Sequence, residues 1–310
     1  MNNLNLMFNK TYYEKLGCPK EELEKDIEKK NKVIFGTVFD PDKDFVPCEI
    51  AGEDEKFRLM TTYPGILIGT GNPHGTGEAD SDINTGFSFD YVTGQPYIPG
   101  SSVKGILRSY FETSEKRRAI AQILKGIDGT DRDDKQILEI EKDIFDGRDV
   151  FLDAVVARGG YYGELVGPDY LTPHKSPVSD PLPIHIIKVI PNVVFEFRFI
   201  FSEDGSLPRK TKTELFKAIL MYFGAGAKTN TGYGRFTEVS DIPEAYRGAR
   251  PVRDDNKTRH NDNFRQKPQG KTEGSNGERI RCPHCGASNF VYLRNGRKAT
   301  YCYKCKKSLY

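Results

Sequence analysis

The 310-residue sequence predicts an α+β main domain followed by a small, separate cysteine-rich module. Apolar runs typical of strands alternate with helical patterns through most of the chain. After residue 240, Asp, Asn, Arg, Gln, Gly and Pro dominate, and four of the six cysteines then fall in the last 29 residues. We therefore expect three parts: residues 1–240, a flexible basic linker over 241–280 and the module over 281–310.

Helices and strands are both indicated in the main domain. Apolar residues recur with helical spacing over residues 103–111 and 215–223, and Thr213 is placed to cap the second helix. Residues 1–32 are polar and mostly helical in character, with a helix start at Pro19. The expected strands are Tyr63–Gly69, which Pro64-Gly65 interrupts, Phe151–Val156 and Val193–Phe201. These elements favour a sheet covered by helices on one face.

The cysteine-rich module has the ligand spacing of a zinc ribbon. Two Cys-x-x-Cys pairs, separated by 16 residues, are formed by Cys282 and Cys285 and by Cys302 and Cys305. Four thiolates complete the tetrahedron that Zn2+ prefers and leave no open position, so we expect a structural ion. The residues between the pairs predict a two-stranded hairpin that turns at Asn295-Gly296. His284 is a less favoured alternative ligand.

The net charge of +2 conceals a strong division along the chain. From Arg247 onward there are 16 Lys and Arg against 5 Asp and Glu, a balance of +11, whereas the preceding residues carry −9. Such a tail favours a polyanionic partner, with charge-based solubility as the alternative. No apolar run approaches the roughly 20 residues of a spanning helix. No signal peptide is visible, so we expect a cytoplasmic chain.

A first unusual segment of the main domain is Gly94–Gly105, which leads directly into the first predicted helix. Ser101 or Ser102 can cap that helix, and its free N–H groups would then face a ligand. A helix N-terminus with Lys104 and Arg108 nearby is a natural phosphate site. An ordinary capped helix is the equally weighted alternative.

A second unusual segment, Phe223–Phe236, follows the second predicted helix and is rich in glycine. Its glycines allow a positive φ and close approach of a ligand to the backbone. Lys228, Arg235 and several hydroxyl groups can contact phosphate and ribose, and Tyr233 can stack on a base. It is not a Walker loop, because no Gly-Lys-Ser/Thr closes it. A plain glycine-rich turn into a last strand is the alternative.

Together the two segments resemble the signatures of the RAMP superfamily, the repeat-associated proteins of CRISPR systems. Gly-Ala-Gly, five residues and Gly-Tyr-Gly, over 224–234, is similar to the superfamily's C-terminal glycine loop. Pro96–Gly105 is similar to the signature at the start of its first helix. The motifs Gly69–His74 and Asp169–His174, the latter followed by Pro181–Ile184, look most like the sixth subunit of the type III-B (Cmr) effector complex. The resemblance covers roughly residues 60–240.

The resemblance implies a ferredoxin-like, RRM-related core with long insertions. It also implies a non-catalytic scaffold subunit that binds CRISPR RNA near the guide 3′ end, beside other RAMP subunits and target RNA. The expected RNA contacts are His74, Ser101, Ser102, Lys104, Arg108, Gly226, Lys228, Thr229, Gly232, Tyr233, Gly234 and Arg235. The zinc ribbon lies outside the family pattern, and the acidic core requires any RNA surface to be local. The sequence does not separate the type III-B subunit from a type III-A relative.

Two other functions compete with the scaffold hypothesis. In an RNA endonuclease, His74 would deprotonate a ribose 2′-OH with Glu78, Asp80 or Asp82 nearby, although such an acidic segment is more often a solvated loop. In a protein adaptor, the zinc ribbon would recruit other proteins and RNA contact would be incidental.

Overall fold

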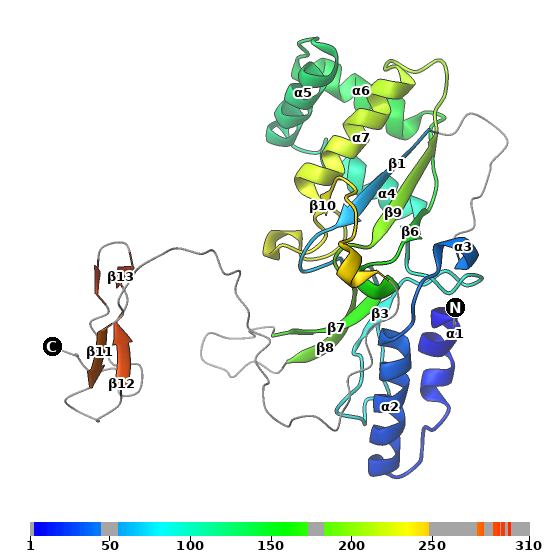
Figure 1. Cartoon of the computed structure of the whole chain (residues 1–310). Helices are drawn as coiled ribbons and strands as arrows, with labels where there is room; N and C mark the ends of the chain where they lie inside the picture. Colours follow the sequence, from blue (N-terminus) through cyan, green and yellow to red (C-terminus); the bar gives the residue numbers. More distant parts are fainter. Residues whose placement is uncertain are drawn as a thin grey trace. The chain divides into compact units, whose positions relative to one another are not determined.

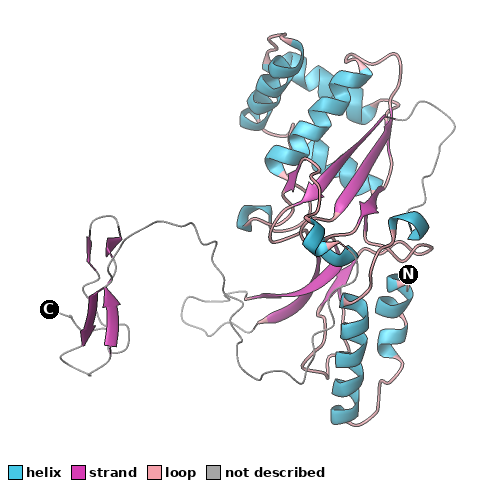
Figure 2. Cartoon of the chain, viewed as in Figure 1, coloured by secondary structure: helices cyan, strands magenta, loops and turns pink. Residues whose placement is uncertain are grey.

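The computed structural model describes residues 3–44, 55–172 and 183–247, and the backbone of four short strands between residues 278 and 298. The chain divides into two compact units, Met1–Pro251 and Val252–Tyr310 (Figure 1). The first unit combines helices with antiparallel strands (Figure 2), which confirms the expected mixture of α and β structure. None of the helices in the described ranges is long and apolar enough to span a membrane.

A six-stranded antiparallel sheet forms the centre of the first unit. Its strands are β1 (Glu55–Thr61), β4 (Tyr97–Ile98), β5 (Val150–Phe151), β6 (Ala154–Arg158), β9 (Val194–Ile200) and β10 (Phe236–Thr237). They are arranged in the order β10-β1-β9-β6-β4, and β5 pairs with the far end of β9. Helices connect β1 to β6 and β9 to β10, so β1, β6, β9 and β10 have the βαββαβ connectivity of a ferredoxin-like core.

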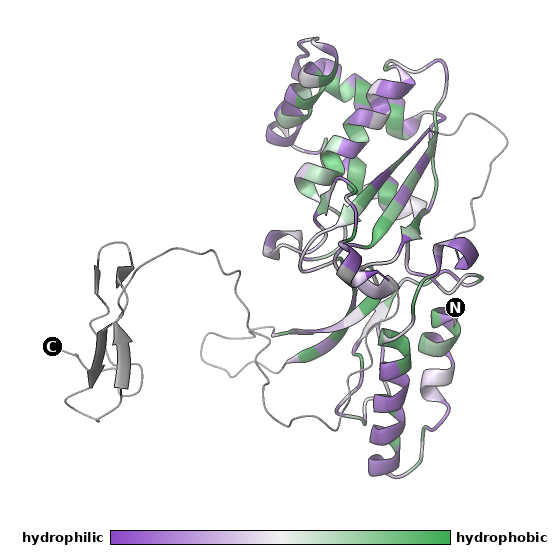
Figure 3. Ribbon diagram, viewed as in Figure 1, coloured by the Kyte–Doolittle hydropathy of each residue, from purple (hydrophilic) through white to green (hydrophobic). Residues whose placement is uncertain are grey.

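Helices cover one face of this sheet. They are α4 (Gly100–Ser109), α5 (Ser114–Asp128), α6 (Asp134–Asp146) and α7 (Arg209–Phe223). Alternate residues of β1 and β9, among them Leu59, Phe197 and Phe199, are buried with the inner faces of the helices in one apolar cluster. Phe216 of α7 lies 5.1 Å from Phe199, ring centre to ring centre. Hydrophobic and hydrophilic residues accordingly alternate along the strands and around the helices (Figure 3).

The starts of these helices differ from the sequence expectation. α4 begins after Pro99 and α7 after Pro208, and neither has a side-chain cap. Ser101 and Ser102 therefore do not cap α4; instead the Gly100 N–H donates to the Asp153 carboxylate at 2.6 Å. Thr213 lies inside α7, where its hydroxyl donates to the Arg209 carbonyl. Proline has already fixed the backbone and removed a donor at the boundary, so the later hydroxyl residues are left within the first turn or two.

Two of the three expected strands also need correction. The strand expected over Tyr63–Gly69 is a turn with a cis Tyr63-Pro64 bond, followed by a single bridge between Ile66 and Val189. The strand expected over Phe151–Val156 is two strands, β5 and β6, which Leu152 and Asp153 separate. The break leaves Asp153 free to bind the start of α4. The expected strand over Val193–Phe201 is confirmed as β9.

A helical layer at the N-terminus packs beside two further strand pairs. It consists of α1 (Leu4–Asn9), η1 (Thr11–Tyr13), α2 (Lys20–Phe35) and α3 (Pro41–Asp44). The strand pairs are β2 (Gly69–Pro73) with β3 (Thr85–Phe87), and β7 (Val166–Leu171) with β8 (Ile184–Val189). The helical character of residues 1–32 and the helix start at Pro19 are thus confirmed.

The second unit contains two short antiparallel pairs in its described part. β11 (Glu278–Arg281) pairs with β12 (Ser288–Val291), and β13 (Leu293–Arg294) pairs with β14 (Arg297–Lys298). The second pair flanks Asn295-Gly296, in agreement with the turn expected there. Phe290 and Val291, expected in the same hairpin, instead pair with β11. Cys282, Cys285, Cys302 and Cys305 lie outside the described residues, so the zinc site stays a prediction.

The segment expected as a linker begins with residues that pack on the first unit. Residues 241–247 are described, and they include the short helix η4 (Glu244–Tyr246). The Tyr246 ring stacks on Tyr161 with 4.4 Å between ring centres. This contact holds the first part of the expected linker against the core unit, whereas residues 248–277 lie outside the described ranges.

One buried ion pair fastens the start of α7 to the sheet. Lys212 Nζ lies 2.6 Å from Asp149 Oδ2, and both side chains are 1% exposed. The second Asp149 oxygen accepts the Ser202 N–H at 2.8 Å. Removing one member of such a pair leaves an uncompensated buried charge.

We therefore expect Lys212→Met to lower the free energy of unfolding by about 3–5 kcal/mol, measured by urea denaturation. Lys210→Met, an exposed lysine on the same helix, is the matched control and should change little. The double variant Lys212→Met/Asp149→Leu should recover most of the loss. A loss below about 1 kcal/mol in the single variant, typical of an exposed pair, would contradict the assignment.

Candidate nucleic-acid interface

The glycine loop, residues 224–235, connects α7 to β10. Gly224, Gly226, Gly232 and Gly234 all have positive φ, and so does Lys228 at 58°. The short helix η3 (Thr229–Thr231) forms its centre. Four left-handed glycines in eleven residues let the chain fold back on itself, because other residues rarely adopt this conformation.

Three of these glycines are required by the protein's own backbone; at Gly224, a Cβ would lie 2.5 Å from the Gly234 carbonyl oxygen. A Cβ on Gly234 would lie 1.7 Å from the Ala225 carbonyl oxygen, and a Cβ on Gly226 would lie 2.5 Å from that of Leu67. Gly232 is different, because the nearest atom to its Cβ position, on Pro64, is 3.8 Å away. The expected approach of a ligand to the backbone therefore stays a prediction for Gly232, where there is space. At Gly226 and Gly234 the protein's own backbone fills that space.

The turn at residues 63–65 holds the glycine loop in place. Gly234 N–H donates to the Gly65 carbonyl at 2.8 Å, and Ala227 N–H donates to that of Leu67 at 3.1 Å. Tyr63, at the tip of this turn, is 84% exposed. An exposed aromatic ring on a rigid turn can stack on a nucleobase. Sequence reasoning missed Tyr63 because it placed this segment in a strand.

Tyr233 has the opposite role to the one expected. It is only 8% exposed, and its hydroxyl donates to Asp169 at 2.7 Å. Lys188 Nζ lies 2.6 Å from the same Asp169 oxygen and 5.8 Å from the Tyr233 ring centre. Tyr233 therefore joins the glycine loop to the β7–β8 hairpin, and it is not available to stack on a base.

The charged side chains of the loop also divide into two kinds. Lys228 is exposed, and its ammonium group has no partner within the described part of the chain. Arg235 donates to the Tyr222 carbonyl at 2.7 Å and to the Thr229 carbonyl at 3.4 Å, so part of its hydrogen-bonding capacity is used inside the loop. Of these two cations, Lys228 is thus the better placed to contact a phosphate. Thr229 accepts a hydrogen bond from Arg235 through its backbone carbonyl.

The first signature segment lies at the far end of a helix from the glycine loop. Tyr110, just after α4, stacks on Phe223 with 4.3 Å between ring centres, so the C-terminus of α4 meets the start of the loop. Ser101 and Ser102 are at the other end of this ten-residue helix, about 15 Å away along its axis. The structure does not bring the two signatures into one cluster at these serines.

The cations of the first segment are occupied as well. Arg108 forms ion pairs with Asp146 at 2.9 Å and Glu141 at 3.2 Å, and Lys104 lies over the Phe151 ring. Asp153 already accepts the N–H at the start of α4, and its negative charge opposes a phosphate there. The expected phosphate site at this helix start is therefore not supported by its surroundings.

His74 is held inside the fold by both ring nitrogens. Nδ1 lies 2.8 Å from the Ile83 carbonyl oxygen and Nε2 lies 2.8 Å from that of Phe8. The Phe8 ring is stacked on the imidazole at 3.7 Å. Burial lowers the pKa of His74, while the two carbonyl oxygens act in the opposite direction. His74 connects α1 to the loop after β2 and presents no free nitrogen to a ribose hydroxyl.

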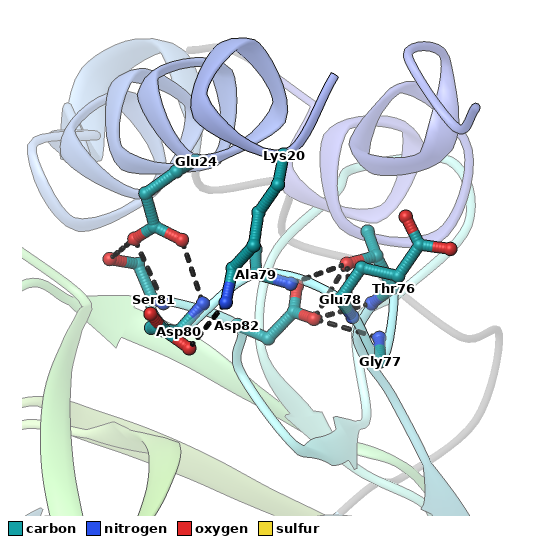
Figure 4. A network of polar contacts seen from close by, with 9 residues as sticks. All are labelled: Lys20, Glu24, Thr76, Gly77, Glu78, Ala79, Asp80, Ser81 and Asp82. Carbon is teal, nitrogen blue, oxygen red and sulfur yellow. Dashed lines mark hydrogen bonds and ion pairs between the residues drawn. The ribbon is translucent and has the colours of Figure 1, made fainter. Parts of the chain in front are cut away.

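The acidic segment after His74 is a folded loop rather than a set of free carboxylates. Asp82 is 2% exposed and accepts three hydrogen bonds, from the Thr76 N–H and hydroxyl and from the Gly77 N–H (Figure 4). Glu24 of α2 accepts the N–H groups of Asp80 and Ser81 and the Ser81 hydroxyl. Lys20 pairs with Asp80 at 3.3 Å. These contacts bind the loop to α2.

Glu78 is exposed, and it forms no described contact with His74. Within the described ranges, no group of three or more His, Cys, Asp or Glu side chains could hold a metal ion.

The Tyr233–Asp169 bond gives a pH-dependent test of the loop anchor. Although burial raises the pKa of Asp169, the bonds from Lys188 and Tyr233 hold it below 3.8. A lowered carboxylate pKa stabilises the fold above 3.8, and this contribution is lost as pH falls through the folded-state value. Tyr233→Phe should therefore cost about 1–2 kcal/mol at neutral pH and progressively less below pH 3.8.

Urea denaturation across this pH range measures the effect. Tyr170→Phe is the control, because that hydroxyl has no partner among the residues described on the same hairpin. If Tyr233→Phe lowers the free energy of unfolding by the same amount at neutral pH and below pH 3.8, Tyr233 acts through packing alone.

Comparisons with known proteins agree with the glycine signatures. The model of the RAMP superfamily matches residues 58–237. The CRISPR system CMR subunit Cmr6 of Saccharolobus solfataricus is 31% identical over 189 residues, covering 59% of this chain and 57% of the relative. The chain thus spans little more than half the length of that protein.

Two solved structures show weaker likeness. A chain in the type III-B Cmr-β complex bound to cognate target RNA has a TM-score of 0.41 and 24% identity, over 61% of this chain and 59% of that one. Cmr6 from Pyrococcus furiosus has a TM-score of 0.38 and 21% identity, over 61% and 99%. Because the superfamily model matches more than half of its residues, this chain belongs to the RAMP superfamily.

Proposed function

We propose that this chain is an RNA-binding scaffold subunit of a type III-B CRISPR effector complex, in the place of the sixth subunit. Its relative from S. solfataricus carries that name, and the superfamily match includes the whole glycine loop. The proposed ligand is CRISPR RNA near the guide 3′ end, with other RAMP subunits and target RNA as neighbours. The observation that carries this proposal is the exposed pair Tyr63 and Lys228 on a rigid, interlocked loop surface.

The charge distribution supports local rather than general contact with RNA. Residues before Arg247 carry a net charge of −9, and Arg108, Lys188 and Lys212 are used in internal ion pairs. Lys228 forms no ion pair among the described residues, and its loop is hydrogen-bonded to the turn that carries the exposed Tyr63. One cation and one exposed ring per site suit a subunit that holds a few nucleotides while its neighbours hold the rest.

A scaffold role fits the surroundings of the residues considered for RNA cleavage. Both ring nitrogens of His74 face backbone carbonyls, and Asp82 and Asp80 are engaged by the loop and by α2. A general base must reach the proton that it removes. No observation on these residues favours the endonuclease over the scaffold.

Replacing Tyr63 or Lys228 with Ala should weaken the binding of CRISPR RNA by the full chain. Loss of one stacked base costs about 1–3 kcal/mol, and loss of one phosphate contact lowers the slope of log K against log salt by about 0.7. Fluorescence anisotropy over a salt series measures both. Tyr91→Ala, 83% exposed on another turn, and Lys135→Ala, exposed on α6, are matched controls.

If both variants keep the wild-type affinity and the wild-type slope of log K against log salt, the glycine loop is not part of the RNA-binding surface. Repeat RNA incubated with the same proteins should keep its length. Specific cleavage that His74→Ala abolishes would establish the endonuclease instead.

The tail adds a separate proposal. We propose that Cys282, Cys285, Cys302 and Cys305 hold one structural Zn2+ and that the basic tail supports RNA contact. Metal analysis should then find one zinc per chain, and Cys302→Ser/Cys305→Ser should lose it. Because residues 241–247 pack on the first unit, the chain should be cut after Pro251. The truncated chain could keep its RNA affinity but no longer assemble with partner proteins. That result would favour the protein-adaptor role for the ribbon.

A further inference from the structure

A second surface with the chemistry of an RNA site lies beside the end of β6. An open pocket of about 360 Å³ is lined by the segment after α2, by the turn that follows β6 and by residues 242–247. Arg158, Tyr162, Tyr246 and Arg247 line it together with Phe39 and Gly160. We call this the Tyr–Arg pocket. Its volume is within the usual range of ligand pockets, which begins near 300 Å³.

Arg158 enters the Tyr–Arg pocket with most of its hydrogen-bonding capacity unused. Its Nη2 donates to the Ser240 carbonyl at 2.8 Å, whereas the buried Nε has no hydrogen-bond partner. The guanidinium forms no ion pair with any carboxylate in the described ranges. Burial lowers the pKa of Arg158 and Arg247 lowers it further, while Asp241 acts in the opposite direction. A half-buried guanidinium without a carboxylate partner, near a second guanidinium, is a place where an anion is stabilised.

Arg247, which also lines the pocket, supplies that second guanidinium. It is exposed, and its Nε donates to the Ile242 carbonyl at 2.8 Å, which fixes the direction of the side chain. Its remaining N–H groups have no partner in the described part of the chain. Two guanidinium groups that line the same pocket suit a phosphate, which accepts hydrogen bonds from several donors at once.

Of the acidic groups nearby, Asp40 is neutralised by a lysine, whereas Asp241 acts on Arg158. Asp40 also lines the pocket, but its carboxylate is paired with Lys43 at 2.7 Å and accepts the Asp42 N–H at 3.1 Å. That lysine holds the pKa of Asp40 below its ordinary value. Asp241 is exposed and forms no ion pair within the described ranges.

Tyrosine rings form the remaining wall. Tyr246 stacks on Tyr161 and meets Tyr162 edge-on at 5.7 Å, and it is itself 39% exposed. Tyr162 has a φ of 58°, a conformation that a bulky side chain rarely adopts without compensation. Aromatic rings next to paired arginines favour a nucleotide over an acidic peptide, because the base can stack while the phosphate is bound.

The Tyr–Arg pocket and the glycine loop lie at the same end of the central sheet. Arg158 is paired across the sheet with Val194, Val194 with Met60, and Met60 with Thr237 of β10, two residues after the glycine loop. Three strand spacings of about 4.8 Å separate β6 from β10, or roughly 15 Å. A single RNA strand that crosses this end of the sheet can reach both places.

We propose that the Tyr–Arg pocket binds one nucleotide of the RNA strand that contacts the glycine loop, with a phosphate between Arg158 and Arg247 and a base against Tyr246. This inference rests on the proposed RNA-binding function. It adds a second contact site, and it assigns residues that lie largely outside the signature motifs.

The test compares two oligouridine RNAs on the full chain, of about 4 and about 16 nucleotides, the ends of the usual site-size range. Tyr246→Ala should lower the affinity of the chain for the longer RNA about 5- to 100-fold. Tyr246→Phe should keep near wild-type affinity, because it retains the ring. Arg247→Gln should lower the salt slope by about 0.7, and Lys135→Ala should not. With 4-thiouridine in the longer RNA, we expect photocrosslinks on the peptide that contains Tyr246.

The outcomes separate this proposal from the general one. Lys228→Ala could weaken RNA binding while Tyr246→Ala and Arg247→Gln leave the affinity for the longer RNA unchanged. In that case the glycine loop is an RNA site and the Tyr–Arg pocket is not. If the wild-type chain binds neither RNA, the proposed function fails with it. Variants that keep full RNA affinity but lose assembly with partner subunits would show that the pocket binds protein. Unchanged melting temperature in each variant excludes unfolding as the cause.

Discussion

The fold around the candidate interface depends on one contact between two tight turns, the hydrogen bond from Gly234 N–H to the Gly65 carbonyl. It joins the chain before β10 to the chain after β1, about 170 residues earlier, and it requires glycine on both sides. A Cβ on Gly65 would lie 2.1 Å from the Val189 carbonyl oxygen, and one on Gly234 would lie 1.7 Å from that of Ala225. The glycines therefore act first as packing elements. Close backbone packing is what fixes Tyr63 and Lys228 on the outside of the loop.

The same arrangement explains how an acidic unit can present a site for a polyanion. Many of its cationic side chains form ion pairs within the unit: Arg108 with Glu141 and Asp146, Lys188 with Asp169, and Lys212 with Asp149. Lys228, Arg158 and Arg247 form no ion pair within the described part of the chain, and the two arginines line one pocket with Tyr162 and Tyr246. Net charge is therefore a poor guide to this surface, because affinity for RNA depends on the few charges that are not already neutralised.

Sequence patterns identified the β9 strand, the helix that starts at Pro19 and the buried faces of α4 and α7, because each depends on local periodicity. They failed where distant contacts decide the structure. Asp153, not a serine, accepts the N–H at the start of α4. The Tyr233 hydroxyl is hydrogen-bonded to Asp169, and both ring nitrogens of His74 are hydrogen-bonded to the carbonyls of Phe8 and Ile83. Tyr63 was missed for a related reason: its turn is stabilised by a loop far away in sequence, and no local pattern distinguishes it from a strand. The family could be read from short motifs, whereas the roles of individual residues within those motifs could not.

The two proposed contact sites have a common physical origin in the sheet. β6 and β10 are short strands on either side of the β1–β9 pair, and both the turn after β6 and the glycine loop emerge at the level of Met60 and Val194. Antiparallel pairing with a fixed register places these two irregular segments at the same end of the sheet. Each can then vary its side chains while the spacing between the sites stays constant. A scaffold that must hold an RNA strand in a defined path needs that constancy more than it needs high affinity at either site.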